Sequence, residues 1–70
     1  MADAIHAGSL SAAELGQRVA AELNHIFVIG ILSSFQMTRV GAQREVWIQL
    51  ECDGCYRHGT VLAETKVLVG

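Results

Sequence analysis

The clearest structural signal in this sequence lies in residues 44–62, which read REVWIQLECDGCYRHGTVL. Apolar and polar residues alternate from Val46 to Cys52, as they do in a strand with one buried face. Asp53-Gly54 is a preferred type I′ hairpin dipeptide, because both central residues of that turn need positive φ. The sequence therefore predicts a β-hairpin that turns at these two residues.

A two-residue turn fixes which positions of the two strands face each other. Arg57 then lies opposite Leu50 on the apolar side, and a bulge near Gly59 would relieve this mismatch. The expected cross-strand pairs are Val46 with Val61, Trp47 with Thr60, Glu51 with Tyr56, and Cys52 with Cys55.

Residues 11–24 carry the pattern of an amphipathic helix. Ser11 and Glu14 fit a capping box, in which each side chain bonds the backbone N–H of the other residue. Apolar residues then recur at a spacing of four, which is typical of one helix face. These residues are Leu15, Val19 and Leu23. We expect a helix over residues 11–24, preceded by an N-terminal arm over residues 1–10.

The apolar run IFVIGIL, residues 26–32, fits two structures. Its β-branched residues favour a strand, although a helical period can be followed through Leu23, Phe27 and Gly30. We favour the strand. A strand that is apolar on both faces must pack against other structure on both faces, and one helix can cover only one of them. This run therefore hints at a partner.

The expected fold is α+β, in a single domain of residues 1–70. The N-terminal amphipathic helix packs on a three- to four-stranded antiparallel sheet, the β-meander of residues 26–69. A short strand over residues 35–40, turning at residues 41–42, would complete this sheet.

Composition favours association. The chain has only 70 residues, yet 51% of them are apolar and 17% are charged. So short a chain has too little interior to hide that much apolar surface, and association is the usual remedy. The net charge is −2 with scattered basic residues, so no cluster could neutralise a row of phosphates. We expect a homo-oligomer and no nucleic-acid partner.

The sequence also favours a cytoplasmic location. It starts without the basic segment of a secretion signal. The uncharged run of residues 23–38 is too short and too polar to span a bilayer, so no membrane partner is expected. Two cysteines without a secretion signal are typical of free thiols in a reducing compartment.

Cys52, Cys55 and His58 are the sharpest candidates for chemistry, because two thiols and an imidazole at this spacing could bind zinc. A structural zinc site needs a fourth ligand, which His25 or His6 would have to supply. A redox pair is a further alternative, although redox motifs of this kind usually open a helix. We favour two cysteines that simply flank the hairpin turn, and we expect no metal or cofactor.

No catalytic arrangement accompanies the three histidines. No nucleophile or orienting carboxylate stands near them in a known pattern, and the serines lack a G-x-S-x-G context. No phosphate-binding glycine loop is present. We therefore expect no enzyme and assign no catalytic residue.

The hairpin offers a second apolar face, opposite the face of Val46. Trp47, Tyr56, Leu62 and Leu68 lie on it. Trp and Tyr dominate binding hot spots because they bury a large area at low entropic cost. We assign these four residues to an interface.

Residues 46–54, followed by Gly59, Thr60 and Val61, resemble the first hairpin of an Sm-like barrel. Residues 59–69 are similar to the closing strand of hot-dog acyl-thioester domains. Each resemblance covers under half of the chain. Neither brings a catalytic or ligand residue with it, so both imply a generic hairpin and no family.

The function that fits these patterns is a small protein-binding module, an inhibitor or adaptor that acts through its surface as a homodimer. The second hypothesis is a small-molecule-binding domain with its pocket at a subunit interface, and the third is a zinc-stabilised module. Small proteins of phages and mobile elements often share this organisation, which is an analogy only. A protein-binding module keeps Trp47 exposed, whereas a ligand-binding domain buries it in a pocket.

The missing fourth ligand leads to a prediction about metal content. The purified protein should contain no stoichiometric zinc, and a chelator should leave its melting temperature unchanged, because three soft ligands do not close a structural site. Elemental analysis and thermal melting check this. One zinc per chain would instead assign Cys52, Cys55 and His58 as ligands.

Overall fold

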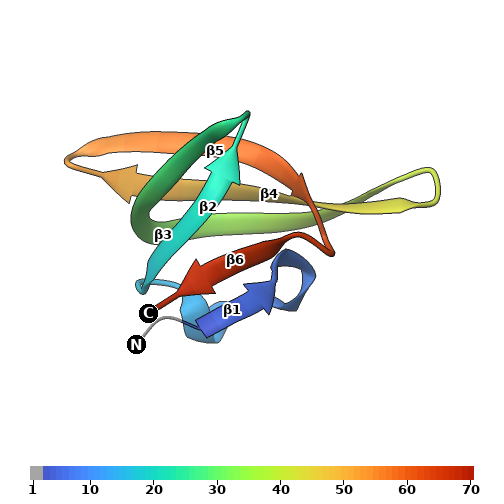
Figure 1. The fold of residues 1–70 in the computed structure, drawn as a ribbon, viewed down its shortest axis with the longest axis horizontal. Helices are drawn as coiled ribbons and strands as arrows, with labels where there is room; N and C mark the ends of the chain where they lie inside the picture. Colours follow the sequence, from blue (N-terminus) through green and yellow to red (C-terminus); the bar gives the residue numbers. More distant parts are fainter. Residues whose placement is uncertain (1–2) are drawn as a thin grey trace.

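The protein is a single antiparallel sheet of six strands, seen in a computed structural model that describes residues 3–70. The strands lie in the order β1-β6-β2-β3-β4-β5 (Figure 1). Their bounds are β1 Asp3–His6, β2 Arg18–Leu23, β3 Ile26–Val40, β4 Gln43–Cys52, β5 Cys55–Leu62 and β6 Lys66–Val69. Two short 3-10 turns, η1 (Ala7–Ser9) and η2 (Ala12–Glu14), precede β2. None of the described residues forms a helix long and apolar enough to cross a membrane.

The α+β prediction is therefore wrong, because the expected helix over residues 11–24 does not form. Its start signal is real: the Ser11 N–H donates to Glu14 Oε1 at 2.7 Å, and the Ala13 N–H donates to Ser11 Oγ at 3.3 Å. This capping box closes only the single turn η2. Gly16, with φ +86°, lies in the left-handed region just beyond that turn.

Strand β2, Arg18–Leu23, occupies most of the second half of the expected helix. Val19, Ala21 and Leu23 are buried, while the residues between them are exposed or half-buried. A spacing of four residues is also a multiple of two, so Val19 and Leu23 share one face of a strand as readily as one face of a helix. Asn24 and His25, with φ +52° and +67°, then form a tight turn into β3.

The hairpin of β4 and β5 confirms the predicted register throughout, including Val46 with Val61 and Cys52 with Cys55. Both turn residues have positive φ, +52° at Asp53 and +82° at Gly54, as a type I′ turn requires. The bulge expected near Gly59 is absent from this pair of strands, whose register runs on without a shift.

The segments 26–32 and 35–40 both form the strands expected of them, and they join into one long strand, β3. A bulge separates them, because Leu32 pairs with Leu50 and the next pair is Ser34 with Gln49. The extra residue, Ser33, donates from its hydroxyl to the Gln49 carbonyl at 3.1 Å. One extra residue reverses which side chains point inward, so Leu32 and Phe35 both face the core.

The sheet curls so that β5 approaches β2, as Figure 1 shows. A Cβ placed on Gly59 would come within 2.9 Å of the Leu23 Cβ and 3.3 Å of its Cα. Close by, Asn24 Nδ2 donates to the His58 carbonyl at 3.4 Å. The core fills the inside of this curl with aliphatic residues from every strand but β1. Its largest fully buried side chains are Val19, Leu32, Val46, Ile48, Leu50 and Val67.

The close approach at Gly59 predicts the effect of adding one methyl group. Gly59→Ala should lower the free energy of unfolding by about 1–3 kcal/mol, the usual effect of overpacking, because the Leu23 backbone limits how far its Cβ can move. Thr60→Ala, one residue along the same strand at an exposed position, should change it by less than about 1 kcal/mol. Chemical denaturation of both variants checks this, and equal stability of Gly59→Ala and the parent would contradict the close packing of β5 on β2.

Candidate functional site

The first half of β3 presents large apolar side chains to the outside of the curled sheet. Phe27, Ile29 and Ile31 are 61%, 55% and 38% exposed, while Val28 and Leu32 between and beyond them are buried. This alternation is that of a strand with one face in the core. No residue of the described chain covers the outward-facing side chains well enough to bury them.

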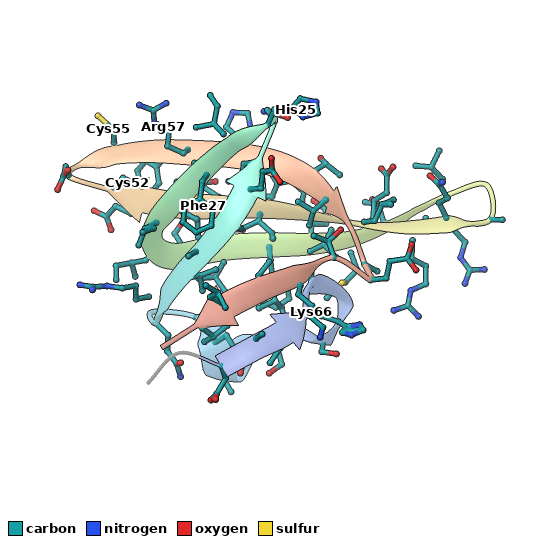
Figure 2. All side chains as sticks on the ribbon, viewed as in Figure 1. His25, Phe27, Cys52, Cys55, Arg57 and Lys66 are labelled. Carbon is teal, nitrogen blue, oxygen red and sulfur yellow. The ribbon has the colours of Figure 1, made fainter. Side chains whose placement is uncertain are left out.

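Neighbouring strands extend this surface sideways. The register sets Ala20 of β2 opposite Ile29, and Leu68 of β6 opposite Ala20. Beyond Leu68, β1 contributes Ala4, which is exposed. Leu68 itself is 41% exposed and lies between two buried valines. Figure 2 places Phe27 on the part of β3 that lies beside β2. We call this surface the apolar outer face, which comprises Ala4, Ala20, Phe27, Ile29, Ile31 and Leu68.

Charged residues stand at its two ends. On β2, Arg18 pairs with Ile31 and Glu22 pairs with Phe27. Both are exposed, and they lie two residues to either side of Ala20. On β4, Glu51 pairs with Ile31 from the other side. The apolar outer face therefore carries a basic residue at one end of β2 and an acidic residue at the other.

The four residues assigned to an interface from sequence fall into two places. Leu68 belongs to the apolar outer face. Trp47, Tyr56 and Leu62 lie on the outer surface of β4 and β5, where the Trp47 ring centroid is 5.9 Å from that of His58 at an interplanar angle of 36°. Tyr56 is 58% exposed, whereas Trp47 is half-buried. We call Trp47, Tyr56, His58 and Leu62 the Trp47 patch.

Sequence reasoning named no residue of β3 as part of an interface, although Phe27 and Ile29 are the most exposed large apolar residues of the outer face. The signal was present in the run of residues 26–32, which is apolar at both alternating positions. The run by itself gives only a hint of a partner, because a helix and a strand would expose different side chains of these residues. The register to β2 removes this ambiguity.

The cysteines lie opposite each other at the end of the β4–β5 hairpin. Cys52 is half-buried, and its thiol donates to the Ile29 carbonyl at 3.2 Å. Cys55 is exposed and projects from β5 beside Arg57 (Figure 2). His58 takes the other side of β5, where it contacts Trp47, so it does not join the two thiols. Within residues 3–70, no three His, Cys, Asp or Glu side chains gather closely enough to hold a metal ion.

Two shallow grooves lie elsewhere on the described surface. One, of about 370 Å³, is bordered by His6, Ser9, Arg44 and Glu64 among others. The second, of about 270 Å³, lies where β5 approaches β2 and includes Glu22, His25 and Thr60. Each of them mixes acidic and basic or imidazole side chains, so neither favours one sign of ligand charge.

Comparison with known proteins found no matching family model, no matching curated protein and no matching solved structure. The functional argument therefore depends on the chemistry and exposure of the surfaces described above.

Proposed function

We propose that this chain is a small protein-binding module that acts through its surface as a homodimer. The observation that carries the proposal is the apolar outer face, on which Phe27 and Ile29 are more than half exposed. Monomeric proteins rarely leave a contiguous apolar patch of more than a few hundred Å² uncovered. Covering this face with protein would remove the excess apolar surface that the composition implies.

The two surfaces suit two contacts. The apolar outer face is a sheet surface with aliphatic side chains and one phenylalanine, which suits the packing of one sheet on another about 10 Å away. The Trp47 patch combines a tryptophan, a tyrosine and a histidine, which are amphipathic side chains of the kind that anchor contacts between separate proteins. We assign self-association to the first surface and the contact with another protein to the second.

Size also supports self-association. A standard interface buries about 800 Å² from each partner. The isolated chain exposes 4563 Å², so such an interface would cover roughly a sixth of its surface. For a chain of 70 residues with a small core, the added burial is a large share of what holds the fold together.

This proposal predicts a dimer in solution. Sedimentation equilibrium at micromolar concentration should give twice the monomer mass of 7.5 kDa, because association at that concentration corresponds to about 8 kcal/mol, which an apolar interface of this kind supplies. A well-behaved monomer at high concentration would contradict the proposal.

Tryptophan fluorescence tests whether self-association uses the apolar outer face and leaves the Trp47 patch free. Trp47 is the only tryptophan, and it lies outside the apolar outer face. Acrylamide should therefore quench its fluorescence to the same extent at concentrations where the protein is monomeric and where it is dimeric. A quenching constant that falls several-fold on dimerisation would place Trp47 in the self-association contact instead.

A further inference from the structure

The apolar outer face is organised as three rows that run across the strands. The central row consists of Ile29, Ala20, Leu68 and Ala4, which lie side by side on β3, β2, β6 and β1. All four side chains are apolar, and Ala20 is the smallest residue that a strand can present without weakening its backbone. The central row therefore offers a low, uncharged line along which another surface can approach closely.

The two flanking rows differ from each other in charge. One flanking row, two residues from the central row, holds Phe27 on β3 and Glu22 on β2, and the exposed Lys66 of β6, two residues before Leu68, lies at the same level. The other, two residues away in the opposite direction, holds Ile31 and Arg18. Each flanking row thus pairs a large apolar residue on β3 with a charged residue on β2, and the two charges are opposite.

This pattern is complementary to itself. A two-fold axis that lies along the central row, between two facing sheets, reverses the strand direction and exchanges the flanking rows. Phe27 then faces Ile31 of the second copy, and Glu22 faces Arg18 of the second copy. Each contact occurs twice, as in every isologous interface.

The alternative two-fold axis, parallel to the strands between β2 and β3, gives a poorer match. It lays each row on the same row of the second copy, so that Arg18 faces Ile31 and Glu22 faces Phe27. Both charges of each chain would then lose water against an apolar side chain without gaining a partner, which costs several kcal/mol. Between these two axes, charge complementarity favours the one along the central row.

We infer that the apolar outer face is the two-fold interface between two copies of this chain, with Ala20 and Ile29 at its centre and reciprocal Arg18–Glu22 pairs at its ends. This inference rests on the proposed self-association and specifies its geometry. It also leaves the Trp47 patch outside the contact on each copy.

Charge reversal tests the geometry. Arg18→Glu alone sets two carboxylates against each other at both ends of the interface, and Glu22→Arg alone sets two guanidinium groups there. Each should raise the dimer dissociation constant at least tenfold, because like charges facing each other across an interface oppose association. The double variant, Arg18→Glu with Glu22→Arg, restores opposite charges at both ends and should return the constant to within about threefold of the parent.

Rescue in the double variant reports on contacts between copies. Arg18 and Glu22 are four residues apart on one strand, which is about 13 Å and too far for a direct ion pair within one chain. Far-UV circular dichroism and the denaturation midpoint of each variant, measured at a dilution where the parent is monomeric, separate a loss of folding from a loss of association.

A matched pair of substitutions tests the centre of the interface. Ile29→Glu places a charge on the central row and should abolish dimerisation at concentrations tenfold above the parent dissociation constant. Val40→Glu makes the same kind of change at a residue that is 61% exposed, at the far end of β3. It should leave the constant within about twofold of the parent.

The outcomes separate this inference from the proposal beneath it. A parent dimer that none of the charge reversals affects would overturn the geometry while leaving the homodimer in place, and so would single variants that the double variant fails to rescue. A parent protein that stays monomeric would overturn both. Weakening by each single variant, rescue by the double and an unaffected Val40→Glu variant would together support the two-fold contact.

Discussion

The close approach of two backbones at Gly30 is the constraint on which the rest of the structure depends. A Cβ at this position would lie 2.6 Å from the Glu51 carbonyl oxygen and 2.7 Å from Cys52 Sγ. Only glycine lets β4 come so near at the point where β3 bends. Together with the bulge at Ser33, this contact lets one strand serve two halves of the sheet, pairing with β2 in its first half and with β4 through most of its length.

The bend has opposite effects on the two sides of the sheet. On the inside it brings Leu32, Ile48 and Leu50 together and excludes water from them. On the outside it splays the side chains, so Phe27 and Ile29 stand on a convex surface where no other part of the described chain buries them. With six strands and no helix among the described residues, the chain has a single layer, and a single layer can cover only one of its faces. The apolar outer face is a direct consequence.

Local signals in the sequence predicted the hairpin of β4 and β5 because everything that determines it lies within 19 consecutive residues, the alternation and the Asp53-Gly54 turn alike. The helix was predicted wrongly for a reason that is also local. The capping box at Ser11 specifies one turn and does not determine the conformation of the residues after Glu14. A spacing of four between Val19 and Leu23 is common to helix and strand.

Features that depend on contacts far apart in the sequence could not be predicted in this way. Gly59 packs against Leu23, which is 36 positions away in the sequence, and no local periodicity reveals this contact. The same limit applies to the apolar outer face. Its residues come from four strands, and only the pairing of β6 with β2 brings Leu68 beside Ala20. The sequence indicated that apolar surface would be left over, whereas the register shows where it gathers.

The edges of the sheet are protected against pairing with other chains, whereas the apolar outer face is not covered. Exposed edges invite pairing with other chains, and proteins usually shorten or cover them. Here β1 has only four residues, and on β5 the Asn24 side chain occupies the His58 carbonyl, at the place where Gly59 packs against β2. The face has no comparable protection except the charged residues at its margins, which are Arg18, Glu22, Glu51 and Lys66. Arg18 and Glu22 disfavour every way of stacking one sheet on another that leaves both of them against apolar side chains. They act as the counterpart of edge protection: they make indiscriminate association of an apolar surface costly, and in the two-fold arrangement that we propose both of them are paired.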